Sequence, residues 1–380
     1  MKNICLVTGS RAEYGIMREL IKKLYNDADI NLDIIATAMH LEEKYGETYK
    51  EIETDGFSIF RKIPMNLIDT SNQTILNGIA HLTKALGKIF SEKKYDLTII
   101  LGDRYEMLAV ANTSIIYNVP ICHLHGGEIT LGNYDEFIRH AITKMSHIHL
   151  ASTEPYRKRI IQLGEHPDTV YNIGAMGVEN VLKTKLLSKS ALATELGITL
   201  EENYNVILFH PVTIENTQPI RQVEKLLAAL KEVDRQYVFI GSNSDTGSDH
   251  IMDKIRNFVG ENTRHHLFSS VPTLLYHSLV KNSKGLIGNS SSGLIEIPSL
   301  NVATLNIGDR QKGRISGTSV INVPCESTSI IEGIRRMEQV TTFENPYQKD
   351  NSVETAYNII KEALKNKIIK QKIFYDIECH

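Results

Sequence analysis

The sequence predicts an α/β protein made of two Rossmann-like domains, each with a doubly wound parallel sheet, and a cleft between them. Three observations support this prediction. Short apolar runs alternate with helix-length amphipathic stretches, as in strand–helix–strand units. The runs are almost continuously apolar, which is typical of parallel strands covered by helices on both faces. The pattern also restarts in the second half, and 380 residues suit two domains better than one core.

The first half contains five runs of mostly β-branched or apolar residues that are predicted to be strands. They lie at 3–9, 32–38, 96–102, 119–125 and 147–153. Between them, apolar residues recur three and four positions apart, which predicts amphipathic helices such as 16–25 and 137–146. We expect this half to form a domain over residues 1–178.

The second half repeats the alternation. Strands are predicted at 205–211, 238–242, 285–289 and 302–308, and helices at 220–233, 274–283 and 330–340. A linker followed by a capped helix occupies 187–204, so we place the domain boundary near 175–190 and the second domain at 179–351. The last helical stretch, 353–368, is compatible with packing on either half. No short repeat is present, which excludes a solenoid.

Composition excludes several classes of protein. A net charge of −3 gives no reason to expect nucleic acid or an anionic membrane as partner. No apolar run reaches the roughly 18 residues of a membrane span. The apolar run Ile4–Val7 is too short for a signal peptide, so a cytoplasmic location is expected. The scattered cysteines indicate neither a disulfide framework nor a zinc ribbon; they are Cys5, Cys122, Cys325 and Cys379.

Polar clusters follow nearly every predicted strand. They are GSRAEYG, AMH, GDR, HLHGGE, FHP, GSNSD, GNSSSG and GDRQKGR. Because ligands of doubly wound sheets bind at the carboxyl ends of the strands, these clusters are expected to meet in one cleft. The inference depends on their common position and not on any single motif.

Three of these clusters predict an anion site. Ser290 and Ser291 lie between a strand and an expected helix, where backbone N–H groups and hydroxyls favour an anion. A serine that only caps the helix is the alternative. Glu296, one turn further on, suits a ribose diol or a capping role. Arg11 and Arg310 follow strands in opposite halves, so a diphosphate held between the domains is the natural inference, although turn arginines are often only solvated.

Acid–base candidates come from other strand ends. Asp103 follows a mostly apolar predicted strand and either faces the cleft, pairs with Arg104 or caps the next helix. His210 closes a strand of the second half and can serve as an acid–base group or as a partner for phosphate charge. Asp135 and Glu136 begin a predicted helix, where a carboxylate either caps N–H groups or acts on a carbon acid.

The run HLHGGE raises the question of a metal. His123 and His125 are two residues apart, on one face of the expected strand, and Glu128 or Asp135 would complete a zinc set. No cysteine or HExxH motif joins them, and His140 lies in a helix among apolar neighbours. We therefore expect no metal. The two glycines before Glu128 suit a sugar that approaches the backbone closely.

In this order, the clusters resemble the UDP-N-acetylglucosamine 2-epimerase family over essentially the whole chain. The resemblance rests on TGSRAEYG, TAMH, LGDRYEML, HLHGGE, YDEFIRHAITKMSHIHL, FHPVT, GSNSDTGSD, GNSSSGLIEIPS and NIGDRQKGR. It is greatest to the hydrolysing branch that feeds bacterial sialic acid biosynthesis. It implies the glycosyltransferase-B arrangement of the two domains, with a C-terminal helix over 352–380 that packs back on the first.

The resemblance also implies residue roles. The catalytic candidates are Asp103, His125, Glu128, Asp135 and His210. The substrate-binding candidates are Arg11, His40, Arg104, Ser290, Ser291, Glu296 and Arg310. One position departs from the pattern: relatives often carry glutamate where His125 stands, which raises Glu128 as a substitute base.

The implied reaction converts UDP-N-acetylglucosamine and water to N-acetylmannosamine and UDP through 2-acetamidoglucal. No hydride moves, so no cofactor is expected, in agreement with the missing GxGxxG fingerprint. The resemblance further implies a homo-oligomer, either a dimer or a tetramer. A GDP-linked substrate, non-hydrolysing epimerisation, glycosyl transfer and nucleotide-sugar sensing are the alternatives.

Overall fold

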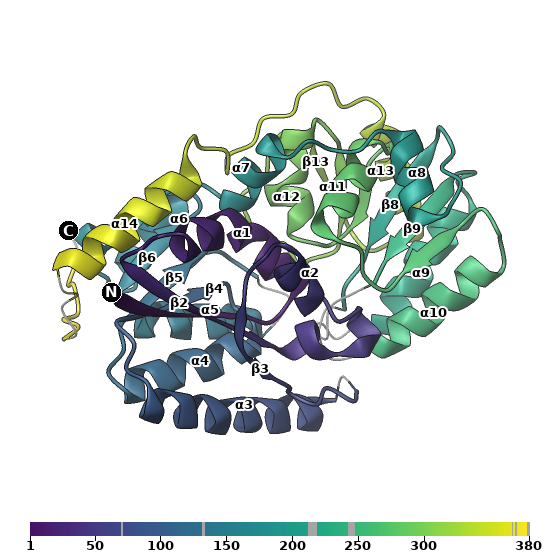
Figure 1. Cartoon of the computed structure of the whole chain (residues 1–380). Helices are drawn as coiled ribbons and strands as arrows, with labels where there is room; N and C mark the ends of the chain where they lie inside the picture. Colours follow the sequence, from purple (N-terminus) through teal and green to yellow (C-terminus); the bar gives the residue numbers. More distant parts are fainter. Residues whose placement is uncertain are drawn as a thin grey trace.

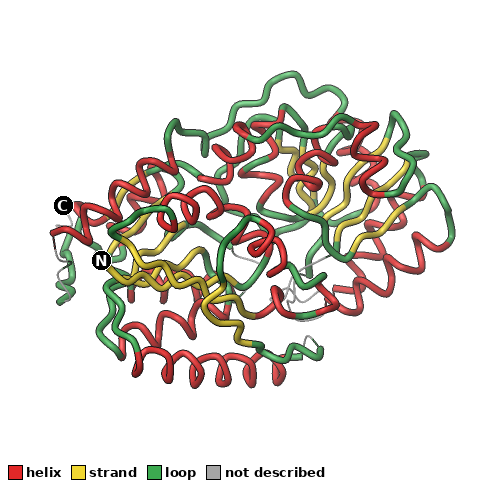
Figure 2. Tube along the Cα trace, in the orientation of Figure 1, coloured by secondary structure: helices red, strands yellow, loops and turns green. Residues whose placement is uncertain are grey.

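The computed structural model of the chain describes residues 1–69, 71–130, 134–211, 219–241, 248–366, 368 and 371–377. Over this part the chain forms two α/β domains that lie side by side, each with its own parallel sheet (Figure 1). Helices flank the strands of both sheets (Figure 2). The predicted fold class is therefore confirmed: two doubly wound parallel sheets in two domains.

The first sheet has seven strands in the order β3-β2-β1-β4-β5-β6-β7, with parallel pairing throughout. The strands are β1 (Lys2–Thr8), β2 (Ile30–Thr37), β3 (Ile59–Ile63), β4 (Leu97–Leu101), β5 (Ile121–Leu124), β6 (Ile148–Ala151) and β7 (Val170–Asn172). The helices are α1 (Arg11–Tyr25), α2 (Tyr49–Thr54), α3 (Asn72–Glu92), α4 (Tyr105–Ile116), α5 (Asp135–Met145), α6 (Glu154–Gln162) and α7 (Met176–Lys183). Short 3₁₀ segments are η1 (Ala38–Leu41), η2 (Glu43–Tyr45) and η3 (Pro167–Thr169). Because β1 pairs with both β2 and β4, the strand order reverses there, at the position where such sheets bind ligands.

The second sheet has six strands in the order β10-β9-β8-β11-β12-β13, again parallel. The strands are β8 (Tyr204–Leu208), β9 (Gln236–Ile240), β10 (His266–Phe268), β11 (Leu286–Gly288), β12 (Thr304–Ile307) and β13 (Val320–Val323). The helices are α8 (Lys189–Leu196), α9 (Pro219–Lys231), α10 (Ser248–Gly260), α11 (Thr273–Lys281), α12 (Ser292–Ile295) and α13 (Ser327–Met337), with η4 (Ile297–Leu300) after α12. The reversal lies at β8, which pairs with β9 and β11.

Each sheet is packed on both faces. In β1, Ile4 and Leu6 join one apolar cluster with α1, whereas Cys5 and Val7 join another with α3 and α4. The strand β8 alternates in the same way between a cluster with α8 and α11 and a cluster with α9 and α13. Since successive strand residues point to opposite faces, a run that is apolar throughout requires helices on both sides.

The predicted strands correspond to β1, β2, β4, β5, β6, β8, β9, β11 and β12. The sequence prediction missed β3, β7, β10 and β13. These four include the edge strands of both sheets, and β7 and β10 span only three residues each. The edge strand β3 carries the exposed side chains Arg61 and Lys62, so its composition lacks the apolar run that identifies a central strand.

Most helix ends lie within one to three residues of the predictions, and two differ by more. Helix α1 begins at Arg11, earlier than predicted, because the Ser10 hydroxyl caps it by accepting a hydrogen bond from the Glu13 N–H at 3.4 Å. The C-terminal helix α14 (Ser352–Asn366) ends at Asn366 and does not continue to 380; the described residues 371–377 form no helix. Helix α14 packs against α1 and shares an apolar cluster with it (Figure 1). Among the described helices, none is long and apolar enough to cross a membrane.

Candidate active site

Two adjoining cavities lie where the carboxyl ends of the two sheets meet. The first is lined by Ser10, Ala12, Glu13, Ile16, Leu101, Gly102, Asp103, Arg104, Thr130, Asp135, Ser291, Arg310, Gln311 and Arg314. The second is lined by Arg11, Ala12, Gly15, Ile16, Leu208, His210, Gly241, Thr273, Tyr276, His277, Ser290, Ser291, Ser292, Ile295 and Glu296. Both cavities take residues from both domains, so together they form one interdomain cleft. Nine of the twelve candidate residues line this cleft.

A buried asparagine organises the donors of the second domain. The Asn289 side-chain oxygen accepts from the His210 N–H at 2.7 Å, and its amide donates to the His210 carbonyl at 2.9 Å. The Asn289 carbonyl accepts from Arg310 Nη1 at 3.1 Å and from Gln311 Nε2 at 2.9 Å. Three segments, those after β8, β11 and β12, are therefore tied together at one point.

Burial and the nearby arginines both lower the pKa of His210. Burial lowers the pKa of His210 well below its ordinary value, and the charges of Arg310, Arg104 and Arg11 lower it further. Both effects favour the neutral imidazole, and an anion bound in the cleft would offset the arginines and raise this pKa again. The cluster therefore favours an anion through its arginines, with His210 as a neutral partner.

The serine loop differs from the predicted helix start. Helix α12 is a single turn of four residues followed by 3₁₀ structure. Its hydroxyls form a chain in which Ser292 lies 3.0 Å from the Ser290 hydroxyl and 2.6 Å from the Tyr276 hydroxyl. Glu296 ends the turn, with its carboxylate 3.4 Å from the ring nitrogen Nε2 of His277. Hydroxyl groups, and not a long helix, supply the donors here.

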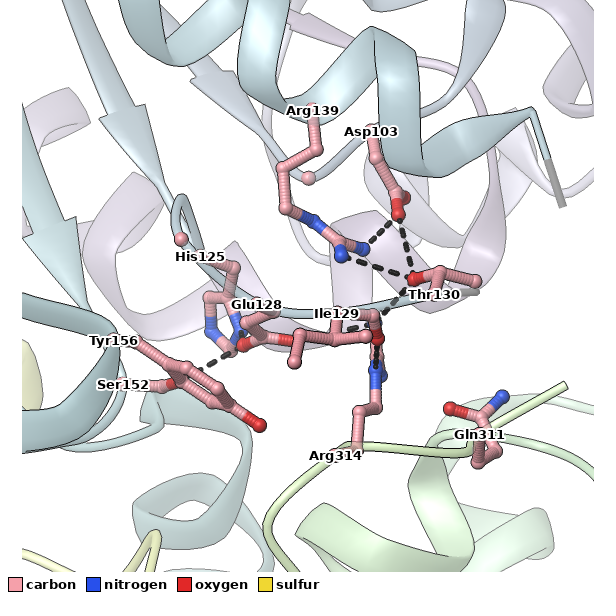
Figure 3. A network of polar contacts seen from close by, with 12 residues as sticks. Asp103, His125, Glu128, Ile129, Thr130, Arg139, Ser152, Tyr156, Gln311 and Arg314 are labelled. Carbon is pink, nitrogen blue, oxygen red and sulfur yellow. Dashed lines mark hydrogen bonds and ion pairs between the residues drawn. The ribbon is translucent and has the colours of Figure 1, made fainter. Parts of the chain in front are cut away.

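Asp103 pairs with a residue that the sequence prediction did not identify. Its carboxylate accepts a hydrogen bond from the buried guanidinium of Arg139 on α5, and another from the Thr130 hydroxyl at 3.4 Å (Figure 3). The alternative that it pairs with Arg104 is wrong, because Arg104 Nε donates to Glu106 at 2.6 Å. Asp103 is not a helix cap either, since Arg104 holds the position before α4.

The two carboxylates at the start of α5 have different surroundings. Asp135 is buried and lines the first cavity together with Asp103. Glu136 accepts from the Thr130 N–H at 2.5 Å and lies 3.1 Å from His140 Nε2, so it ties Thr130 to the first turn of α5. The paired carboxylates of the first cavity are therefore Asp103 and Asp135.

His125 and Glu128 lie beside the cavities and line neither (Figure 3). One Glu128 oxygen is 2.8 Å from His125 Nδ1 and accepts from the Ser152 hydroxyl at 2.8 Å, and the other is 3.2 Å from Arg314 of the second domain. Burial would raise the pKa of Glu128, but the charges of Arg314 and His125 and the two hydrogen bonds outweigh it and lower the pKa to about 2. A carboxylate so fully occupied is a poor base.

The two histidines expected on one face do not converge. Strand β5 ends at Leu124, and His125 has a left-handed backbone with φ of 62°. His123 instead lies 2.8 Å from the Gly102 carbonyl and 3.2 Å from the Thr143 hydroxyl. His40 is also buried outside both cavities, between the hydroxyls of Thr8 and Thr48. The part of the chain that the structure describes holds no cluster of three metal-ligating side chains.

Several residues of the site escaped the sequence reasoning, among them Thr130, Arg139, Asn289 and Gln311 in and beside the first cavity, and Tyr276 and His277 in the second. Arg139 offered one usable signal, because it lies one helical turn after Asp135 on the buried face of α5. Most of the cluster GSNSD, at 242–245, and positions 212 and 213 of FHPVT lie outside the described residues.

The two facing parallel-sheet domains, with a cleft lined by carboxylates and arginines, define a protein of the glycosyltransferase-B type. Comparison with solved structures agrees. The UDP-N-acetylglucosamine 2-epimerase from Neisseria meningitidis, solved with UDP-N-acetylglucosamine bound, superposes with a TM-score of 0.79 over 95% of this chain and 100% of that one. The two sequences are 18% identical in that superposition, so the likeness establishes the fold.

Sequence comparison gives the family. The UDP-N-acetylglucosamine 2-epimerase family profile matches residues 22–361. The polysialic acid biosynthesis protein P7 of Escherichia coli is 47% identical, over 100% of this chain and 99% of its own length. The GDP/UDP-N,N'-diacetylbacillosamine 2-epimerase (hydrolyzing) of Campylobacter jejuni is 37% identical over 99% of each chain. The chain belongs to the UDP-N-acetylglucosamine 2-epimerase family of enzymes.

Proposed function

We propose that this enzyme is a hydrolysing 2-epimerase that converts UDP-N-acetylglucosamine and water to N-acetylmannosamine and UDP. One observation carries the proposal: Asp103 and Asp135 line the same cavity as Arg104 and Arg310. Abstraction of a carbon-bound proton requires a base, and departure of a diphosphate requires cations at the bond that breaks. The names of the relatives, which include a polysialic acid protein and a hydrolysing epimerase, support the same reaction class.

The chemistry proceeds in two steps. In the first, a carboxylate takes the proton from C2 of the sugar, the C1–oxygen bond breaks, and UDP leaves as 2-acetamidoglucal forms. In the second, water adds its hydroxyl to C1 while a proton returns to C2 from the opposite face, which gives N-acetylmannosamine. We assign the proton transfers to Asp103 and Asp135, because they line the cavity and Glu128 does not.

We assign the binding of the leaving diphosphate to the second cavity. Arg11, Arg310 and the serine hydroxyls supply its donors, and Glu296 with His277 suits a ribose. Neutral His210 gains basicity as the diphosphate offsets the surrounding arginines, so it is suited to take up a proton beside the leaving group.

The nucleotide and the sugar are tested together. The enzyme is incubated in deuterated water with UDP-N-acetylglucosamine, and the products are followed by NMR. Parallel incubations use GDP-N-acetylglucosamine and UDP-N,N'-diacetylbacillosamine. We expect free UDP and N-acetylmannosamine in equal amounts, with deuterium at C2. UDP-N-acetylmannosamine without released UDP would contradict hydrolysis. Faster turnover of the GDP-linked or bacillosamine substrate, both suggested by the Campylobacter relative's name, would reassign the substrate.

Assembly and location complete the proposal. We expect a dimer or tetramer in the cytoplasm, where nucleotide sugars are used. Light scattering coupled to size-exclusion chromatography distinguishes these states from a monomer of 42.8 kDa.

A further inference from the structure

The Thr130 hydroxyl lies where the two domains meet, and its hydrogen bonds are fully specified. It accepts from Arg139 Nη1 at 2.9 Å, within the first domain, and from Arg314 Nη2 at 3.1 Å, across the cleft. A hydroxyl has one proton and two acceptor positions. With both acceptor positions occupied by arginines, the proton points to its third neighbour, the Asp103 carboxylate at 3.4 Å (Figure 3).

Arg314 is held against the first domain by several contacts. Its Nε donates to the Ile129 carbonyl at 2.6 Å, and Nη2 is 3.2 Å from Glu128. The next residue, Ile315, donates its N–H to the Tyr156 hydroxyl on α6 at 3.0 Å. The Arg314 side chain is 6% exposed, so these contacts form only when the two domains are together.

We propose that Thr130 is a positioning residue, whose hydroxyl is oriented by Arg314 and thereby aimed at Asp103 when the domains close. The acid–base carboxylate then reaches its working geometry only in the closed enzyme, where water is excluded from the cavity. The proposal builds on the function proposed above. It differs from a diphosphate-binding role for Arg314, because the Nε and Nη2 groups are occupied by residues 128–130.

The test is a double-mutant cycle of Thr130→Val and Arg314→Ala, with Thr130→Ser as the conservative variant. Thr113→Val is the matched control, since Thr113 is a buried threonine that donates within α4 to Ala109 at 2.9 Å. Turnover, C2 exchange in deuterated water and UDP affinity by calorimetry are measured for each. We expect Thr130→Val and Arg314→Ala each to lower kcat by about 10–100-fold, with the Kd for UDP within about twofold of wild type.

Further outcomes decide the proposal. Thr130→Ser and Thr113→Val should keep kcat within about threefold, and the double variant should lose little more than Arg314→Ala alone. Additive losses, equal losses for valine and serine at 130, or a weakened Kd with kcat retained would each overturn the inference. If Thr130→Val does not fold, the second measurement is the kcat of Arg314→Ala with guanidinium added to the solution. A restored kcat would support the role of the Arg314 guanidinium in orienting Thr130, and an unchanged kcat would refute it. A wild-type enzyme that releases no UDP would instead refute the proposed function.

Discussion

The two domains bring opposite kinds of chemistry to the cleft. The first supplies Asp103 and Asp135, and behind them a buried network of charged partners that includes Arg139 and Glu128. The second supplies neutral and cationic donors organised by Asn289. The proposed acid–base carboxylates therefore come from the first domain, and most of the proposed anion contacts come from the second, with Arg11 of the first domain and His210 of the second as the exceptions. Substitutions in the first should mainly change turnover, and substitutions in the second should mainly change affinity.

The largest expected effect comes from Asp103→Asn. The amide still accepts from Arg139 but cannot take a proton, so kcat should fall by about 10²–10⁴-fold. The affinity for UDP, which we expect to depend mainly on the second cavity, should change by no more than about twofold. Steady-state release of UDP gives kcat, and calorimetry with UDP gives Kd.

A distant carboxylate controls for the loss of charge. Asp168→Asn, at a side chain that is 88% exposed, should leave both quantities unchanged. If Asp103→Asn kept its turnover, or if it weakened UDP binding to the same degree, the division between the domains would not hold.

The next effect concerns acid stability. The pKa of Glu128 is lowered to about 2 in the folded protein, against an ordinary value of 4.5. A carboxyl group with a depressed pKa stabilises the fold above its unfolded value and loses that contribution as the pH falls through the folded value. At pH 7 the free energy of unfolding of the wild type should therefore be higher than that of Glu128→Gln by on the order of 3 kcal/mol. The difference should vanish between about pH 4.5 and 2, which denaturant titrations across this range measure.

The second domain offers the matched control. Glu261 forms an exposed pair with Lys231 at 2.7 Å, and its side chain is 60% exposed. Glu261→Gln should change the free energy of unfolding by less than about 1 kcal/mol at every pH. An equal pH dependence of the two variants would mean that burial in the Glu128 network has no special effect.

The Arg310→Gln substitution tests whether the second domain contributes to UDP affinity. Loss of one charged donor near a diphosphate should weaken UDP binding by about 10–100-fold, since such hydrogen bonds contribute about 1.5–3 kcal/mol. Turnover at saturating substrate should fall less than tenfold. Arg310 also donates to the Asn289 carbonyl. Gln311→Leu, which removes the other donor to that carbonyl and leaves the charge unchanged, therefore separates the loss of this hydrogen bond from the loss of the charge. If both variants lower the UDP affinity equally, the loss comes from the missing hydrogen bond to the Asn289 carbonyl and not from the missing charge.

The contrast between the domains also explains what the sequence could predict. Central strands were predictable because burial on both faces requires apolar runs, and the polar clusters at their ends marked the cleft. The pairing inside the cleft was not predictable in this way. Arg314 and Thr130 are 184 residues apart, and Asp103 bonds Arg139, 36 residues away, in preference to its neighbour Arg104. Adjacent side chains after a strand point in different directions, so nearness along the chain is a poor guide to ion pairing.

His125 gives the smallest and most local effect, because it lies outside both cavities and contacts the chemistry only through Glu128. Its backbone is left-handed, which asparagine tolerates well, and an asparagine amide can still donate to Glu128. His125→Asn should keep the free energy of unfolding within about 1 kcal/mol of wild type. His125→Glu places a second carboxylate against the first, and should cost about 1–3 kcal/mol.

Guanidinium chloride unfolding and kcat distinguish two interpretations of this position. If His125→Glu loses stability and turnover while UDP binds as before, this network has been rebuilt around histidine and supports the first domain alone. If His125→Glu retains both, the position accepts either side chain, and the glutamate that the family resemblance implies there has no separate catalytic task in this chain. His166→Glu, at an exposed histidine 3.7 Å from Asp168, controls for the added charge and should shift the free energy of unfolding by less than about 0.5 kcal/mol.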